Sequence, residues 1–209
     1  MQITKLGHSC LHVVDGTANI LIDPGTFSAG FEILTDLTAI LVTHEHADHL
    51  DLDRLPGVVA ANPQAAVYAD GGSAPRIEAA GITVTAVKAG DSFDVGTPVV
   101  VFGVNHAVIH ADLPSVANAS YLIGGRLLHP GDSLSVPAVA VEILAVPAAA
   151  PWMALKEGVD FYRAVAPKVA FPIHERILAN PAMAYGLLEK LGPQTSTWLA
   201  PADGAPFDV

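Results

Sequence analysis

The sequence predicts an α/β protein arranged as a four-layer αββα sandwich, an α+β organisation in which two mixed sheets pack together and helices cover their outer faces. Strand-like segments come first and in runs, later helices are dispersed between strands, and each half of the chain supplies strands and then helices. A doubly wound parallel sheet is the alternative, but three consecutive strands open the chain and no GxGxxG pattern follows the first. Because no linker rich in serine, proline or charge separates the halves, we expect one domain over residues 1–209.

The first half of the chain alternates apolar segments with turn residues, as at 15–17 and at the Pro-Gly pair 24–25. A short helix is expected within residues 48–57, with leucines loosely on one face and Pro56 ending it, and a second helix is expected over 73–81. The strands expected in this half are 2–7, 10–14, 18–22, 37–43, 65–70 and 82–87.

The second half repeats this style. Residues 154–167 have the pattern of an amphipathic helix, and residues 180–192 form a further expected helix with Pro181 near its first turn. Two adjacent glycines at 124–125 predict the turn of a hairpin. The strands expected here are 97–105, the hairpin 119–131, 139–147 and 168–174.

Composition limits the partners and the compartment of the protein. The hydrophobic content of 51% is spread in short runs, and Glu142, Pro147 and Pro151 interrupt the most apolar stretch before it could span a bilayer, so no membrane partner is expected. A net charge of −11, from 21 acidic and 10 basic residues, disfavours nucleic acid. The single cysteine, Cys10, and an N-terminus without a signal-peptide pattern favour the cytoplasm.

Residues 44–49, HEHADH, concentrate metal-binding side chains at the end of the strand expected over 37–43. His44 and His46 alternate off an extended segment and can face one ion, while Asp48 and His49 follow at the turn. Four ligand-type side chains in six residues exceed the needs of one tetrahedral site with an open position, so two adjacent ions fit better. The competing interpretation is a histidine-rich surface loop, or a helix start capped by Asp48.

The HEHADH segment resembles the HxHxDH signature of the metallo-β-lactamase-fold hydrolases. The other landmarks of that family follow in order: a histidine after a later strand in VNHAVIH, a Gly-Asp after a hairpin in PGDS, and a histidine closing a strand in FPIHE. The LIDPG and PIH elements and the short chain look most like the UlaG-like, single-domain branch. The resemblance implies the αββα metallo-β-lactamase fold and a hydrolase with a binuclear metal centre.

Carried over to this sequence, the family pattern implies two divalent metal ions, with zinc expected and manganese or iron as alternatives. One ion would be held by His44, His46 and His106, the second by Asp48, His49 and His174, with Asp132 bridging them. His110 competes with His106 as a ligand, and otherwise it would line the pocket. His46 occupies the position where flavodiiron proteins of this fold carry glutamate, which argues against redox di-iron chemistry.

Further residues are expected beside the ions or in the core. His8 and Asp23 resemble positions bordering the site, where they could orient ligands. Short loops are expected to build the pocket, and their apolar side chains either line it or belong to the core, namely Phe27, Phe31, Leu113, Trp152 and Met153. The same apolar rim could serve a homo-oligomer contact. His12, His129 and Cys10 are expected to be structural.

These features predict a hydrolase that uses metal-activated water, with Asp48 as the catalytic proton acceptor. The expected substrate is a small ester, lactone or amide. The alternative is a phosphodiesterase or nuclease of the same fold, which the acidic charge weakens, and the third class is a protein that binds metal without turnover.

Overall fold

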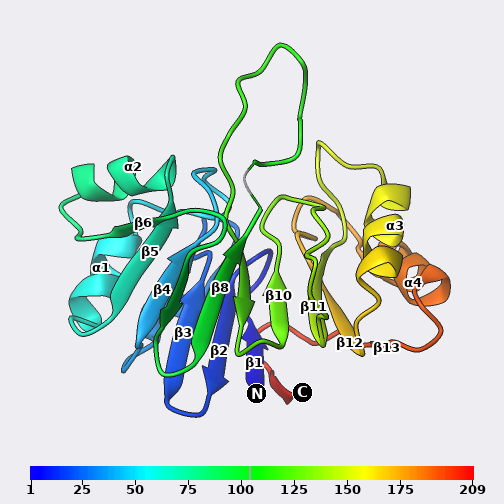
Figure 1. Cartoon of the computed structure of the whole chain (residues 1–209), viewed down its shortest axis with the longest axis horizontal. Coiled ribbons are helices and arrows are strands. Elements are labelled where there is room, and N and C mark those ends of the chain that lie inside the picture. The colour runs from blue at the N-terminus through cyan, green and yellow to red at the C-terminus, as the bar shows by residue number, and fades with distance from the viewer. Residues whose placement is uncertain (104) are drawn as a thin grey trace.

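The computed structural model describes residues 1–103 and 105–209, and two stacked seven-stranded sheets form its centre (Figure 1). Helices α1 (Leu55–Ala61) and α2 (Ser73–Ala79) cover the outer face of the first sheet, while α3 (Leu155–Val165) and α4 (Ala182–Leu191) cover that of the second. The predicted four-layer αββα sandwich is therefore confirmed, and the doubly wound parallel sheet is excluded.

The first sheet has an antiparallel half, from β14 (Pro206–Asp208) to β3 (Ala18–Ile22), and a parallel half, from β3 to β6 (Thr85–Val87). Parallel neighbours cannot be joined by a tight turn, so α1 and α2 lie in the crossovers of the parallel half. In spatial order the strands are β14 (Pro206–Asp208), β1 (Gln2–Lys5), β2 (Leu11–Asp15), β3 (Ala18–Ile22), β4 (Ala39–Val42), β5 (Ala66–Asp70) and β6 (Thr85–Val87).

The second sheet repeats this division, with antiparallel pairs from β7 to β10 and parallel pairs from β10 to β13. Helix α3 connects β11 to β12, and α4 connects β12 to β13. In spatial order the strands are β13 (Thr197–Trp198), β12 (Val169–Ile173), β11 (Ile143–Pro147), β10 (Leu127–His129), β9 (Ser120–Ile123), β8 (Pro98–Phe102) and β7 (Ser92–Asp94).

Three apolar cores separate the four layers. The central core lies between the sheets and includes Ile20, Tyr121 and Phe171, and one outer core lies under each pair of helices. Tyr121 on β9 also donates its hydroxyl to the carbonyl oxygen of Val42 on β4, at 2.8 Å. This buried hydrogen bond ties the two sheets together directly beneath the end of β4.

The structure corrects several expected elements. The helix expected within residues 48–57 and ended by Pro56 is wrong: α1 begins at Leu55, and Pro56 lies in its first turn, where a missing N–H costs no helical hydrogen bond. The short 3-10 helix η1 (Phe31–Ile33) and the strands β7, β13 and β14 were not expected, because two or three residues carry no measurable periodicity. The strand expected over 97–105 ends at Phe102, and Val104 lies outside the described residues.

Polar residues follow the carboxyl ends of several parallel strands. Asp23 follows β3, His44 follows β4, Asp132 follows β10 and His174 follows β12. These ends lie along one edge of the sandwich, at the top in Figure 1. Open α/β sheets bind ligands at the carboxyl edge of their strands.

Among the described residues, no helix combines the length and apolarity that crossing a bilayer requires.

The link between the two sheets provides a stability test. Tyr121→Phe should lower the free energy of unfolding by about 1 to 3 kcal/mol, because it removes a buried hydrogen bond. Chemical denaturation would measure this loss. Tyr68→Phe is the matched control, since the Tyr68 hydroxyl makes no hydrogen bond within the described part of the chain, and it should change stability by less than about 0.5 kcal/mol. Equal losses in both variants would contradict a role for the Tyr121 bond.

Candidate metal centre

Two groups of imidazole and carboxylate side chains lie next to each other at this edge. Within each group, the potential ligand atoms all lie within 4.8 Å of one another. The first group is His44, His46, His106 and Asp132, and the second is His8, Asp48, His49 and His174. The structure thus brings together all seven residues expected as ligands, and it adds His8 to the second group.

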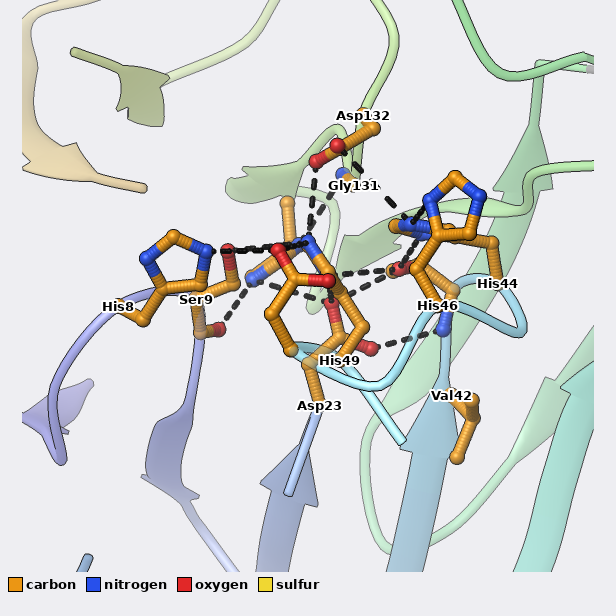
Figure 2. Close-up of polar contacts among 12 residues, drawn as sticks. His8, Ser9, Asp23, Val42, His44, His46, His49, Gly131 and Asp132 are labelled. Carbon is orange, nitrogen blue, oxygen red and sulfur yellow. Dashed lines mark hydrogen bonds and ion pairs between the residues drawn. The ribbon is translucent and has the colours of Figure 1, made fainter. Parts of the chain in front are cut away.

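The Asp132 carboxylate lies between the two groups. Its Oδ1 atom is 3.0 Å from Nε2 of His49 and 3.1 Å from Nε2 of His174, in the second group. Its Oδ2 atom is 3.2 Å from Nε2 of His106 and 3.9 Å from Nε2 of His44, in the first. Figure 2 shows Asp132 above His49, with His44 and His46 on one side and His8 on the other. Each carboxylate oxygen therefore faces a different group.

The turn that presents Asp132 requires glycine at position 131. Gly131 has a φ of +60°, and a Cβ atom there would lie 2.3 Å from the side-chain oxygen of Asn118. The same Asn118 oxygen accepts the backbone N–H of Asp132 at 3.0 Å. A larger residue at 131 would displace Asn118, and with it the backbone of Asp132.

Four histidines of the centre have their Nδ1 atom against a protein acceptor. A neutral imidazole carries one hydrogen, so an Nδ1–H that is donated to the protein leaves the Nε2 lone pair free for a metal ion. The acceptors are Asp23 for His49 (2.7 Å), the carbonyl oxygen of Ala149 for His174 (2.7 Å), the Thr43 hydroxyl for His44 (3.1 Å) and the carbonyl oxygen of Ala107 for His106.

Asp23 is fully buried and lies behind the second group. Its carboxylate accepts the Thr43 backbone N–H and the Thr43 hydroxyl, each at 2.8 Å, in addition to Nδ1 of His49. These contacts support the expected role of Asp23 as a partner that orients a ligand. Thr43 was not expected at the site, although its position directly before the HEHADH segment could have indicated it.

His8 differs from the other histidines of its group. The backbone N–H of Arg176 points at Nδ1 of His8 at 3.3 Å, so the hydrogen of neutral His8 belongs on Nε2. Nε2 in turn lies 3.0 Å from Oδ2 of Asp48, to which it donates. Burial lowers the pKa of His8, which favours this neutral form. The contacts support an orienting role toward Asp48.

The donor set fits divalent ions. Oδ1 of Asp132 and Nε2 of His174 are buried and have no hydrogen-bond partner of acceptable geometry within the described residues, although they lie 3.1 Å apart. Leaving such atoms unsatisfied is costly, and a shared cation would satisfy both. Burial also lowers the pKa of His44 well below its ordinary value, which keeps this imidazole neutral and able to bind metal.

His106 and His110 lie in different surroundings. His106 is buried in the first group, whereas the His110 side chain is 67% exposed and accepts the backbone N–H of Asp112 at 3.2 Å. Both residues line a cavity of about 260 Å³ within the loop 106–116. His110 is therefore placed outside both groups.

The expected pocket residues fall into different environments. Trp152 is half-buried and donates Nε1–H to Oδ2 of Asp132 at 2.8 Å, and half-exposed Phe27 packs edge-on against the ring of His8. Leu113 is exposed on the loop 106–116, and Met153 lines a separate cavity of about 290 Å³. Of the two alternatives for Phe31, the structure selects the core, because this ring is fully buried in an outer core.

The residues expected to be structural match that role. His129 is buried and holds two loops together, since its Nε2 lies 2.8 Å from the carbonyl oxygen of Ser9 and its Nδ1 accepts the N–H of Gly131. Cys10 is buried in an outer core. His12 lies outside both groups, with its ring against the side chain of Asn19.

A family model that describes a beta-lactamase superfamily domain matches residues 2–174 of the chain, a span that includes every member of both groups. The chain belongs to the beta-lactamase superfamily. This membership confirms the resemblance of the HEHADH segment and its companion motifs to metallo-β-lactamase-fold proteins.

The chain is also similar to individual proteins. The protein Rv0786c of Mycobacterium tuberculosis is 48% identical over 199 residues, which cover 91% of this chain and 92% of the relative. A UPF0173 metal-dependent hydrolase of Methanopyrus kandleri is 30% identical over 208 residues, covering 83% of this chain and 84% of the relative. Igni18, a metallo hydrolase of the archaeon Ignicoccus hospitalis, superimposes with a TM-score of 0.73 at 19% identity, covering 100% of this chain and 98% of that structure, which shows the shared fold.

The two histidines of the loop 106–116 should respond differently to substitution. His106→Ala removes an imidazole from the first group and should abolish tight binding of one zinc ion. His110→Ala is the matched control and should retain the zinc content of the unsubstituted protein, because His110 touches neither group. Elemental analysis after dialysis would measure both. Loss of zinc from the His110 variant alone would reverse the assignment.

The charge state of His174 predicts how metal uptake depends on pH. Burial lowers the pKa of His174, but the adjacent carboxylates of Asp132 and Asp48 outweigh it and raise this pKa to about 9. Metal-free protein at pH 7 therefore holds a proton that a metal ion must displace, and apparent zinc affinity should rise as the pH increases toward 9. The stability that this proton gives the metal-free fold is complete below pH ~6.5 and is lost as the pH rises through 9.

Calorimetric titration of zinc in buffers with different ionisation enthalpies would count the released protons. The expected result is net proton release at pH 7, which decreases as the pH approaches 9 or above. Metal uptake at pH 7 without proton release would contradict a protonated His174.

Proposed function

We propose that this protein is a metal-dependent hydrolase that uses two divalent ions to cleave a small ester, lactone or amide. The observation that carries the proposal is the position of Asp132, whose two oxygens face two separate groups of imidazoles. The relatives named as metal-dependent hydrolases support the reaction class. Zinc is the proposed metal, because a ligand set of buried imidazoles with few carboxylates suits it, while manganese and iron remain alternatives.

In this proposal His44, His46 and His106 would hold one ion, Asp48, His49 and His174 would hold the other, and Asp132 would be shared between them. Divalent ions supply Lewis acidity, which lowers the pKa of water toward neutrality and polarises a carbonyl oxygen. The protein contributes the fixed direction of its ligand atoms, because the Nδ1 contacts behind the imidazoles prevent the rings from turning.

Asp48 is the proposed proton acceptor. Its side chain is 22% exposed, more than that of Asp132, so its carboxylate can be reached from the solvent side of the centre. Burial would raise the pKa of Asp48, but the nearby His174 imidazole and the hydrogen bond from His8 outweigh it and lower this pKa well below its usual range. Asp48 is therefore ionised at neutral pH, the form in which its carboxylate could accept a proton from the attacking water and pass it to the leaving group.

The surroundings of the centre favour a neutral or weakly charged, partly apolar substrate. Phe27 lies beside His8, Trp152 lies beside His106, and exposed Val108 and Leu113 extend from the adjoining loop. The negative net charge is unfavourable for a polyanionic nucleic acid. The substrate is accordingly proposed to be a small molecule, with the whole chain acting as a single hydrolase domain.

Metal analysis and activity measurement test the proposal together. Protein purified without chelator should contain close to two zinc ions per chain. It should hydrolyse at least one member of a panel of esters, lactones and amides, lose this activity with a chelator and regain it with zinc. Activity confined to phosphodiesters would replace the substrate class, and two bound ions without turnover of any compound would indicate a binding function.

Asp48→Asn tests the proton acceptor, and it should lower kcat by about 100-fold or more on the best substrate of the panel. Asp112→Asn removes a carboxylate with a 90% exposed side chain on the loop 106–116, and it should leave kcat unchanged. Equal activity in the two variants would remove Asp48 from the mechanism.

A further inference from the structure

Trp152 makes a hydrogen bond that the metal-binding motifs do not explain. Its indole Nε1–H donates to Oδ2 of Asp132 at 2.8 Å, the same oxygen that lies 3.2 Å from Nε2 of His106. The indole ring also stands edge-on to His106 and His174, with ring centroids 5.7 Å and 6.3 Å apart. Trp152 therefore contacts the carboxylate that joins the two groups, and it lies beside one histidine from each.

The local backbone directs Trp152 to this position. It lies in the connection from β11 to α3, where the backbone N–H of Met153 donates to the carbonyl oxygen of Ala150 across a tight turn containing Pro151. One residue earlier, the carbonyl oxygen of Ala149 accepts Nδ1 of His174. Residues 149–152 thus restrain two members of the centre at once.

The two carboxylate oxygens of Asp132 differ in their hydrogen bonding. Oδ2 accepts the indole hydrogen, whereas Oδ1 has no hydrogen-bond partner of acceptable geometry among the described residues. Rotation of an aspartate carboxylate about its last bond is only weakly restricted by the side chain itself, since this torsion has broad minima. An indole N–H donates only and cannot change roles, so its hydrogen bond selects one orientation of the carboxylate.

We propose that Trp152 is a positioning residue for the metal centre, whose N–H holds the Asp132 carboxylate with one oxygen toward each group and thereby sets the affinity for the more weakly bound ion. This inference rests on the proposed binuclear function. Partners that orient metal ligands typically contribute about 10- to 100-fold to metal affinity. Trp152→Phe keeps an aromatic ring and removes the donor, so the second zinc ion should bind about 10- to 100-fold more weakly in this variant.

The chain offers a matched control, because its other tryptophan is remote from the centre. Trp198 packs against Tyr162 and Tyr185 under α3 and α4. Trp198→Phe should bind both zinc ions with the affinities of the unsubstituted protein. It also leaves Trp152 as the only indole, so its fluorescence should change during a zinc titration in step with binding of the ions.

A double-mutant cycle distinguishes an effect of Trp152 through Asp132 from a general increase in the mobility of residues 149–152. If Trp152 acts through that carboxylate, Trp152→Phe should weaken zinc binding in the unsubstituted protein but not in an Asp132→Ala background. A loss of equal size in both backgrounds would overturn the inference. So would zinc affinities in Trp152→Phe equal to those of the unsubstituted protein, or Trp152 fluorescence in Trp198→Phe that stays constant while calorimetry records two bound ions.

These results can be told apart from failure of the proposed function. If the unsubstituted protein binds no zinc, manganese or iron after reconstitution, the binuclear function and the role of Trp152 are both overturned. If it binds two ions and only the Trp152 variants behave unexpectedly, the role of Trp152 alone is overturned. Fluorescence of Trp198→Phe keeps the test decisive even if Trp152→Phe does not fold, because that variant retains every residue of the centre.

Discussion

The buried carboxylate of Asp132 between two groups of imidazoles is the interaction on which the centre depends. At hydrogen-bonding distance it faces His49 and His174 with one oxygen and His106 with the other. Burial would raise its pKa, but the positive charge of His49 and the closeness of the His106 and His174 imidazoles outweigh this and lower that pKa well below its ordinary value. Without metal, protonated imidazoles supply the positive charge that divalent ions supply in the proposed function, and proton and metal therefore compete for the same atoms.

The fold supplies this arrangement through its strand ends. Each sheet has a parallel half, and the carboxyl ends of these halves lie at one edge, where Asp23, His44, Asp132 and His174 leave the sheets. The turns there are strained. His8, Asp23 and His174 all have φ values between 48° and 66°, a left-handed conformation that costs a residue with a Cβ atom about 1 kcal/mol or more. The surrounding contacts must compensate for that cost, for example the backbone hydrogen bond from His174 to the carbonyl oxygen of His8.

The candidate metal ligands are held in place by hydrogen bonds from residues that do not themselves belong to either group. Asp23 accepts three hydrogen bonds and fixes His49, while the Thr43 hydroxyl contacts both Asp23 and His44. On the other side, buried Lys5 bonds to Glu175, which accepts the backbone N–H of His8. These contacts come from segments far apart in the chain, so a local pattern in the sequence reveals few of them.

Local patterns in the sequence by themselves determined the layer architecture and the composition of the centre. Apolar runs broken by turn residues predict most strands and both long helices, and the HEHADH segment concentrates four metal-binding side chains within six residues. The short strands β7, β13 and β14 were not predicted, because two or three half-exposed residues are too few to show an alternation of apolar and polar side chains. Pro56 was misassigned, since the same residue suits the first turn of a helix as well as its end.

Tertiary structure alone decided which atoms face each other. The sequence left His106 and His110 as competitors, and it placed His8 and Asp23 beside the site without saying which ligand each would orient. These choices depend on loop direction, burial and the position of the hydrogen on each imidazole. Likewise, Phe31 and Trp152 were equivalent as apolar loop residues, yet packing buries Phe31 in an outer core and aims the Trp152 N–H at Asp132. The physical reason is that ligand chemistry belongs to a residue type, whereas the direction of a ligand atom is set by contacts between segments up to about 170 residues apart, as between the Arg176 N–H and His8.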